Sequence, residues 1–423
     1  MVFHSVVLDE DNCMGCTNCL KRCPTEAIRI KNKKAVIIKE RCIDCGECIV
    51  VCPYHAQDSV TDELEDMNKF EYNIAIPSNT LYGQFSLDTD MDRVFQGILN
   101  MGFDYVYDEG RASDILASTL KDAINKKDCN KPVISSLCPA VIRLIQIRFP
   151  SLIDNIIRLE SPMEIAARMA KKEIMEKYNI PYEKIGAFYL TPCPAKYTSI
   201  KEPLGIKKSY MDGAISIKKI YGDLVRNEKT IKNANKFEKG SSKGIGWSRV
   251  GGQSMAVGMK NYVGVDGIEN VIKVLEEIEN GNLTEIDYFE GYACIGGCVG
   301  GPLNVENPHI AKSRIRQIYD GNRNVKIYTD KEKSMFKELF DSGYLSWTED
   351  IKAKSAMKID DDIKKAFFKI GSINNIVKSL PGLDCGSCGA PSCKALAEDI
   401  VCGNSKLEDC IFMVKENVQG GIK

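Results

Sequence analysis

Three short segments, SSLCPA at 135–140, TPCPAK at 191–196 and YACIGGCVGG at 292–301, decide how the middle of this chain folds. Each sets a cysteine beside a proline or a pair of glycines, which lets the backbone turn sharply and approach a bulky inorganic group. Thiolates are soft ligands that select iron–sulfur clusters, zinc or copper(I). Convergence of three separate segments favours one large buried cofactor over a small zinc knuckle. The expected ligands are Cys138, Cys193, Cys294 and Cys298, with Gly296 and Gly297 forming the turn between the last two.

Composition and charge narrow the class of protein. The chain has 423 residues, 44% hydrophobic and 27% charged, which is ordinary for a globular protein of two to four domains. A formal net charge of −1 gives no broad attraction to nucleic acid or to a membrane surface. No apolar run reaches the roughly 20 residues that span a bilayer, and the N-terminus lacks the pattern of a signal peptide. We therefore expect a cytoplasmic protein with no nucleic-acid or membrane partner.

The chain holds 18 cysteines but only three histidines. In a reducing compartment so many cysteines indicate metal ligation rather than disulfides. Cys129 stands apart from the three cysteine groups, and we expect it to be an inert or surface thiol. The groups predict three domains: a ferredoxin-like one at 1–65, a cofactor-binding one at 66–350 and a small iron–sulfur one at 351–423.

The first group is an internal repeat in which the spacing Cys-x2-Cys-x2-Cys-x3-Cys-Pro occurs twice. This is the spacing of bacterial ferredoxins with two 4Fe-4S clusters, in which the fourth cysteine of each run binds the other cluster. One cluster would be held by Cys13, Cys16, Cys19 and Cys52, and the second by Cys42, Cys45, Cys48 and Cys23. A pair of zinc sites is the alternative. So short a domain needs its clusters for stability, and two adjacent clusters serve electron transfer.

Residues 61–350 alternate between expected strands and helices. Short apolar runs predict strands at 72–78, 132–140, 184–193 and 286–294, and the last three lead directly into the cysteine segments. Helical periodicity appears at 91–103 and 141–149. The alternation predicts an α/β fold with mostly parallel sheets covered by helices. Ligands in such folds lie at the carboxyl ends of the strands, where these cysteines are expected.

Two further segments of this region carry local expectations. Ser161 should cap a helix, with Pro162 in its first position and Glu164 completing a capping box. Residues 204–246 are rich in lysine and weakly patterned. We expect them to form a solvated insertion, with a docking surface for an acidic ferredoxin as the alternative.

The third cysteine group has the spacing Cys385-x2-Cys388-x4-Cys393-x16-Cys410 and lies between helical segments. Four thiols in this arrangement predict a further 4Fe-4S cluster, with zinc as the alternative. Cys402 is a second candidate for the fourth ligand, and the spacing alone leaves both open.

Together, the three cysteine segments in this order and the N-terminal repeat resemble the iron–iron (FeFe) hydrogenases, from residue 1 to about residue 320. In that family the four matching cysteines hold a 4Fe-4S cluster. One of them bridges to a two-iron subsite with CO, cyanide and azadithiolate ligands, and the whole is called the H-cluster. The resemblance implies that Cys298 is the bridge and that Lys196 holds one cyanide. It also implies backbone contacts to the cofactor from Pro77 and Ser78 and from Gly251 and Gly252.

Departures from the family pattern concern proton transfer. Active members carry two adjacent cysteines in the first segment, and the first of them donates protons to the bridging amine. Here that position is Leu137, which has no titratable proton. Thr191 and Tyr292 stand where the family has methionines, and Ser199 stands where it has a glutamate, with Glu202 nearby.

Upstream, a glutamate of the family's proton path aligns with Arg111, and a second acidic position aligns with Asp114. For Glu109 and Asp114 we expect nothing more than a solvated helix end.

The resemblance implies reversible H2 oxidation, coupled to ferredoxin or another redox protein, at a subsite installed by maturation proteins. H2 would split at the open position of the distal iron, and electrons would leave through the 4Fe-4S clusters. With Leu137 in place, water or the hydroxyl groups of Ser136, Thr191 or Tyr292 would carry the proton, so turnover should be slow. The pattern is also similar to divergent members thought to sense H2. A third possibility is an iron–sulfur scaffold without the two-iron subsite.

Overall fold

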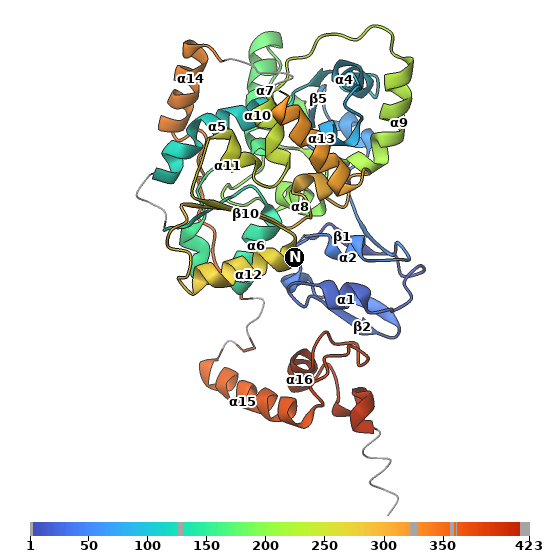
Figure 1. Ribbon diagram of the computed structural model, residues 1–423. Helices are drawn as coiled ribbons and strands as arrows, with labels where there is room; N and C mark the ends of the chain where they lie inside the picture. Colours follow the sequence, from blue (N-terminus) through green and yellow to red (C-terminus); the bar gives the residue numbers. More distant parts are fainter. Residues whose placement is uncertain (1–2, 126–129, 322–327, 356–358, 361, 415–423) are drawn as a thin grey trace, which may run out of the picture. The chain divides into compact units, whose positions relative to one another are not determined.

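The computed structural model describes residues 3–125, 130–321, 328–355, 359–360 and 362–414. The chain forms two compact units: the first joins Met1–Ser59 to Ala353–Lys423, and the second is Val60–Lys352 (Figure 1). Cys129, expected to be an inert or surface thiol, lies outside the described residues. Among the residues described, none of the helices combines the length and the apolar character that crossing a membrane requires.

The N-terminal part of the first unit is a small α+β fold built on antiparallel strand pairs. The pairs are β1 (Val6–Leu8) with β4 (Gln57–Ser59), and β2 (Ile28–Lys31) with β3 (Lys34–Ile37). The short helices α1 (Asn18–Arg22) and α2 (Glu47–Val50) each carry one cysteine of the repeat. Two of the six buried residues of its apolar core, Cys13 and Cys19, are themselves predicted ligands. A core this small leaves the fold dependent on the groups that its thiols bind.

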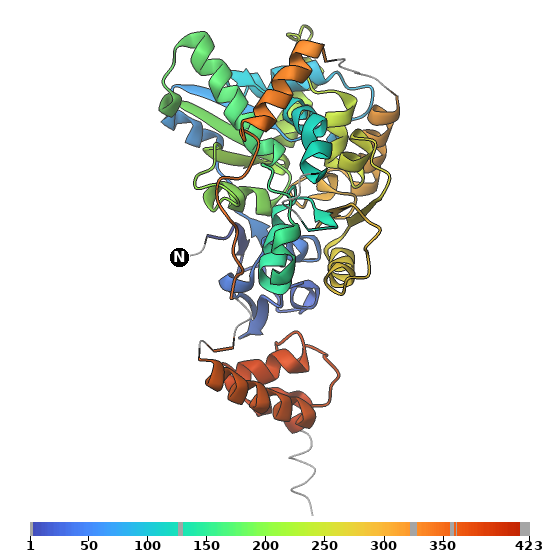
Figure 2. The ribbon, with the colours of Figure 1, turned by 90° about the vertical axis from the view of Figure 1, so that its left-hand side faces the viewer.

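The C-terminal part of the same unit consists of two helices that pack side by side, α15 (Ile363–Ser379) and α16 (Cys393–Val401) (Figures 1 and 2). Asp362 and Ser392 cap their N-termini through side-chain oxygens. The apolar core between the helices includes Leu396 and Cys410.

The turn that carries the C-terminal cysteines packs against β2. The Ile30 N–H donates to the Gly389 carbonyl at 2.9 Å, and Arg29 donates to Asp399 at 2.6 Å with its side chain only 4% exposed. Gly389 has φ +83°, and a Cβ there would meet the Ile30 carbonyl oxygen at 2.1 Å. Only glycine permits both this backbone conformation and this approach.

The second unit contains a four-stranded parallel sheet. In spatial order its strands are β6 (Tyr105–Val106), β5 (Tyr72–Pro77), β8 (Ile185–Thr191) and β9 (Gly213–Ser216). The helices α4 (Met91–Leu99) and α9 (Ile217–Thr230) pack together and bury Ala75, Phe188 and Leu190 of the sheet (Figure 1). The helix α7 (Pro162–Tyr178) also packs on β5 and β8. The sheet is therefore covered by helices, as the sequence predicts.

A second parallel sheet lies in the same unit, in the order β10 (Tyr262–Asp266), β11 (Tyr288–Tyr292) and β7 (Val133–Ile134). The helix α12 (Ile268–Glu279) packs on β10 and β11 through one apolar side. Both sheets are parallel throughout, which confirms the predicted fold class.

Three local expectations differ from the structure. The strand expected at 132–140 has only the two residues of β7, because the chain turns toward its cysteine directly afterwards. The segment 204–246 is not a solvated insertion throughout, since β9 is buried and α9 buries Ile217, Ile220 and Leu224. Ser161 does cap α7, but Glu164 accepts from Ser209 and Tyr210 instead of closing a capping box.

Gly389→Ala should separate the C-terminal part from β2. The substitution adds a clash with the Ile30 carbonyl to the backbone strain of a positive φ, which alone costs about 1–2 kcal/mol. Gly403→Ala is the matched control, because Gly403 has φ +77° and nothing within 4 Å of its added Cβ. Hydrogen exchange measured by mass spectrometry should become faster at residues 28–31 in Gly389→Ala only. Equal protection in the two variants would show that the packing does not depend on this contact.

Candidate functional site

The predicted ligands of the central site follow the carboxyl ends of parallel strands. Cys138 comes after β7 and caps α6 (Pro139–Arg148), and Cys193 comes after β8 and caps α8 (Pro194–Lys201). The remaining pair lies in the turn after β11, where the Gly297 N–H donates to the Cys294 carbonyl at 3.2 Å. The free N–H groups of a first helical turn favour a thiolate. In α8 the N–H groups of Ala195 and Lys196 lower the pKa of the Cys193 thiol in this way, against the larger effect of burial.

Backbone contacts link the second cysteine segment to the end of the third, and hold the third against Val250. The Leu303 N–H donates to the Pro192 carbonyl at 2.9 Å, and the Val250 N–H donates to the Gly296 carbonyl at 3.1 Å. Gly297, with φ +102°, approaches so closely that an added Cβ would meet the Val250 nitrogen at 2.7 Å. The predicted pair Gly251 and Gly252 begins α11 (Gly252–Ala256), next to this contact.

Three of the four thiols, those of Cys138, Cys193 and Cys298, are close enough for their charges to interact. Burial raises the pKa of Cys193 to about 11, and the Cys138 thiol adds to the shift. Burial also raises the pKa of Cys298, with further contributions from Cys138 and Cys193. Metal binding has to remove these protons. Thiolates are soft donors, and neighbouring thiolates in glycine-containing turns suit an iron–sulfur cluster. Cys138, Cys193 and Cys298 would be its ligands together with Cys294.

Lys196 is a buried ammonium group beside these thiols. Its side chain is 4% exposed, and Nζ lies 2.6 Å from the Tyr189 hydroxyl and 3.4 Å from Glu109 Oε1. Burial opposes the charged form, but the negative charges of Glu109, Tyr189 and the thiols of Cys298 and Cys193 together hold its pKa well above the usual value. The lysine is therefore held as an ammonium group by Glu109 and Tyr189, and its charge interacts with the thiols of Cys298 and Cys193.

The residues around Lys196 correct one expectation. Glu109, at the start of α5 (Glu109–Asn125), is 2% exposed, and it accepts from the Asn79 N–H and the Tyr189 hydroxyl, each at 2.8 Å. Asp114 is 5% exposed and accepts from Ser241. The prediction of a solvated helix end at these two acids is wrong. Both acids face inward because α5 packs against α7 and against α10 (Ser242–Ile245).

Arg111, which aligns with a proton-path glutamate, lies outside this network. It pairs with Glu173 and Glu238 and lies over the Tyr107 ring at 4.0 Å.

The small polar residues predicted to relay protons have local partners. Ser136 donates to the Leu159 carbonyl at 2.8 Å, and Thr191 donates to the Cys193 carbonyl at 3.0 Å. Leu137 is 6% exposed. Ser78, which follows Pro77 at the end of β5, donates its N–H to the Leu190 carbonyl at 3.3 Å and so joins the two strand ends. The two hydroxyl groups orient the backbone of the cysteine segments.

Tyr292 belongs to a buried polar network that sequence reasoning missed. Its hydroxyl lies 2.8 Å from Glu290 Oε1 and accepts from Gln253 Nε2 at 2.9 Å. Gln253 Oε1 in turn accepts from Ser135 and Tyr288. Burial raises the pKa of Glu290, and four hydrogen bonds from Ser254, Gln253 and Tyr292 oppose the shift. One signal was present in the sequence: an acidic residue within an otherwise apolar strand that leads into a ligand segment.

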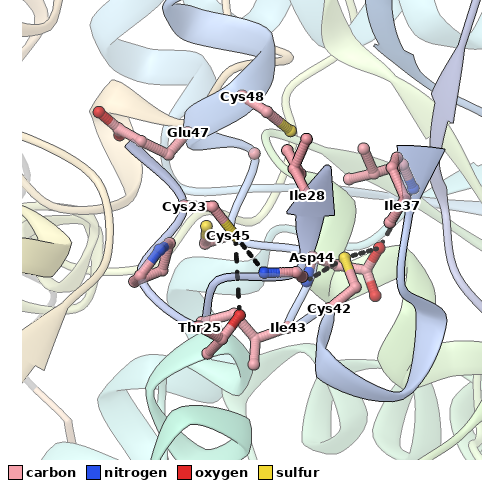
Figure 3. A pocket seen from close by; sticks show the side chains of 14 residues that line it. Cys23, Thr25, Ile28, Ile37, Cys42, Ile43, Asp44, Cys45, Glu47 and Cys48 are labelled. Atoms are coloured by element: carbon pink, nitrogen blue, oxygen red, sulfur yellow. Dashed lines mark hydrogen bonds between the residues drawn. The ribbon is translucent and has the colours of Figure 1, made fainter. Parts of the chain in front are cut away.

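In the N-terminal part, the two cysteine quartets line separate cavities. Cys23, Cys42, Cys45 and Cys48 share one with Ile28 and Ile43 at its wall (Figure 3). The other is lined by Cys13, Cys16, Cys19 and Cys52. Backbone N–H groups point at the sulfurs, as from Ala27 to Cys23 at 3.1 Å and from Ala56 to Cys52 at 3.3 Å. Such bonds tune the potentials of iron–sulfur clusters, and the geometry fits the crossed assignment of the fourth ligands.

The C-terminal cysteines distinguish the two candidates for the fourth ligand. Cys410 is 6% exposed and packs with Cys388 and Cys393 in one core. The pKa of Cys388 is raised first by burial and then by the charges of Cys410 and Cys385. Cys402 is exposed and lines a cavity of about 620 Å³ between α16 and the η1 turn (Lys39–Arg41). This arrangement favours Cys410.

Comparisons with known proteins agree with this geometry. The family described as "Iron only hydrogenase large subunit, C-terminal domain" matches residues 73–260 and 214–302, which together make up more than half of the chain. The chain belongs to this hydrogenase family. A 4Fe-4S dicluster domain matches residues 5–53, and a domain described as a putative Fe-S cluster matches residues 380–412. Iron–sulfur binding is thereby supported at both ends of the chain.

The curated relatives of this family member cover different roles. The NADP-reducing hydrogenase subunit HndD of Solidesulfovibrio fructosivorans is 29% identical over 112 residues, 24% of this chain and 19% of that protein. The cytosolic Fe-S cluster assembly factor NAR1 of Candida dubliniensis is 26% identical over 122 residues, 28% of this chain and 21% of that protein. The chain thus spans about a fifth of the length of these relatives.

Solved structures of the family share the fold. The [FeFe]-hydrogenase HydA(deltaEFG) matches with a TM-score of 0.50 at 15% identity, covering 69% of this chain and 98% of that one. An apo form of HydA1 from Chlamydomonas reinhardtii gives the same TM-score and identity, with 69% and 97% covered. At this identity the likeness concerns the fold alone.

Cys410→Ser should remove one cluster, and Cys402→Ser should not. Loss of a buried fourth thiolate leaves the C-terminal cluster incomplete, so the anaerobically purified variant should lose about four iron atoms per chain. Cys402→Ser is the control, since it changes an exposed thiol of the same segment. Iron analysis and electron paramagnetic resonance of the reduced proteins measure the difference. The reverse pattern would assign the ligand to Cys402.

Proposed function

We propose that this chain interconverts H2 with protons and electrons at an H-cluster, slowly, and exchanges electrons with ferredoxin or another redox protein. Maturation proteins would install the two-iron subsite, and the N-terminal clusters would carry electrons. The observation that carries the proposal is the buried, charged Lys196, whose charge interacts with the thiols of Cys298 and Cys193. A 4Fe-4S cluster alone has no need of an ammonium group there, whereas a cyanide ligand is an acceptor that matches it.

In this function, different residues of the chain would have different roles. Cys138, Cys193, Cys294 and Cys298 would hold the cofactor, and Glu109 and Tyr189 fix the ammonium group of Lys196. When bound, the H-cluster supplies the metal site at which H2 is formed or split. Thr191 orients the Cys193 backbone, and Leu137 keeps an apolar side chain where the family pattern has a proton donor. The protein thereby positions the cofactor and limits its supply of protons.

Two other functions are favoured by particular observations. An H2 sensor is favoured by Leu137 together with a C-terminal iron–sulfur segment that packs on the ferredoxin-like fold. A scaffold without the two-iron subsite is favoured by the likeness to the NAR1 assembly factor. The ion pair between Glu109 and Lys196 also satisfies the lysine without any ligand. Both alternatives keep the 4Fe-4S clusters. The sensor would differ from the proposed function in turnover, and the scaffold would lack the two-iron subsite.

Infrared spectroscopy of the matured protein, paired with an H2 assay on the same sample, tests the proposal. Bands of metal-bound CO and cyanide with measurable H2 turnover are expected. The bands without turnover, but with a response of the redox state to H2, would indicate the sensor. Absence of the bands after maturation, in a protein that retains its 4Fe-4S clusters, would indicate the scaffold.

Leu137→Cys should raise H2 turnover, because it restores a titratable group beside the two-iron subsite. General acid–base groups contribute about 10²–10⁴-fold in rate, which sets the size of the expected gain. Leu137→Ala is the matched control, since it opens the same space without adding a proton donor. H2 evolution and oxidation are measured in fully matured samples with equal CO band intensity. An equal rise in both variants would attribute the effect to space instead of proton transfer.

A further inference from the structure

Glu160 is a buried carboxyl group that lacks a hydrogen bond at one oxygen. Its side chain is 1% exposed, and its backbone is fixed by an N–H bond to the Leu345 carbonyl at 2.9 Å. Among the described residues, Oε1 receives no hydrogen bond. Buried carboxyl oxygens are nearly always paired in folded proteins, so this oxygen needs an explanation.

Two charged groups near Glu160, Arg168 and Glu164, lie on α7, the helix that follows it, and Lys196 of α8 lines the same cavity. Arg168 Nη2 is 3.7 Å from Oε1, too far for a hydrogen bond. The guanidinium of Arg168 donates instead to the Tyr344 carbonyl and lies over the rings of Tyr210 and Tyr344. Glu164, one turn along α7, is occupied by Ser209 and Tyr210. Arg168 therefore forms an ion pair with Glu160 but no hydrogen bond, and its Nη2 and Nε likewise have no hydrogen-bond partner among the described residues.

Glu160 lies next to Leu137, the position at which the family pattern has a proton-donating cysteine. It lines a cavity of about 30 Å³ with Ser136, Leu137, Lys196 and Ser199, which has room for one or two water molecules. An adjacent cavity of about 10 Å³ has a largely apolar wall that includes Leu116, Leu120 and Ile157. Glu160 is the acidic residue that both cavities share with Leu137.

We propose that the carboxyl group of Glu160 holds and passes the proton that the missing cysteine at position 137 handles in the family pattern, an inference that rests on the proposed function. During H2 oxidation, one O–H bond forms at Glu160 with the proton released in the site, by way of a water molecule in the 30 Å³ cavity. The bond breaks when the proton leaves toward solvent. No electron passes through the side chain.

The acidity of Glu160 suits this task. Burial and then the charge of Glu164 raise the pKa of Glu160 to about 8, and Arg168 acts in the opposite direction. A group with this pKa exchanges protons near neutral pH, the condition for effective general acid–base transfer. Ser136 and Thr191 remain tied to backbone carbonyls and offer no comparable group.

The first test needs no catalysis. In protein that carries its 4Fe-4S clusters but no two-iron subsite, the infrared difference between wild type and Glu160→Gln should contain a protonated carboxyl band that titrates near pH 8. Glu160→Asp keeps the carboxyl group and should keep a titrating band. Glu164→Gln is the matched control on the same helix; it should keep the band and lower its midpoint, because a like charge is removed. A difference spectrum without a titrating carboxyl band would overturn the proposal.

The second test uses matured protein. Glu160→Gln should lower H2 turnover by about 10²-fold with unchanged CO and cyanide bands, and adding Leu137→Cys to it should restore turnover. Wild-type turnover in Glu160→Gln, or no rescue by the added cysteine, would overturn the proposal. If wild type shows no CO and cyanide bands, the proposed function fails instead, and the carboxyl titration in the unmatured protein still reports on Glu160.

Discussion

The placement of several buried thiols next to one another is the main electrostatic constraint on the second unit. Burial makes the thiolate forms of Cys193 and Cys298 unfavourable, and each negative sulfur makes the next one harder to form. The bond from the Leu303 N–H to the Pro192 carbonyl nevertheless holds the segments of Cys193 and Cys298 next to each other. Such an arrangement is stable with a cation that replaces the protons, because coordination removes both the desolvation penalty and the repulsion.

A second buried charge, Lys196, sets the electrostatic balance of the site. An ammonium group with so little exposure is strongly destabilising without a partner, and Glu109 provides one through a direct ion pair. Tyr189 completes the arrangement by bonding to both. The same three side chains therefore keep the lysine charged whether or not a ligand is present. Both the hydrogenase and the scaffold functions are compatible with a fold held in this way.

The site differs from the family pattern of active hydrogenases in the groups that could supply protons. Leu137 and the leucines of the adjacent cavity make an apolar wall on one side of the site. Tyr292, Glu290 and Gln253 form a separate set of hydrogen bonds in which each group already has partners. Glu160 differs from these groups because one of its oxygens receives no hydrogen bond and because it lines a cavity large enough for water. In the proposed function, the small number of groups able to exchange protons would make turnover slow.

The sequence by itself determined the iron–sulfur chemistry, because cysteine spacing is a local property that survives without tertiary information. The parallel α/β fold was equally readable, since alternating strands and helices place the cysteines at strand ends whatever the packing. Only the tertiary structure decided which acidic residues are buried and which groups surround them. Glu109 and Glu160 look like ordinary polar positions along the chain, and both are buried because helices and sheets distant in sequence close over them. Burial and charge partners arise from packing, so the surroundings of these acids could be decided only by the folded chain, whereas the cysteine motifs are local and could be recognised from the order of the residues.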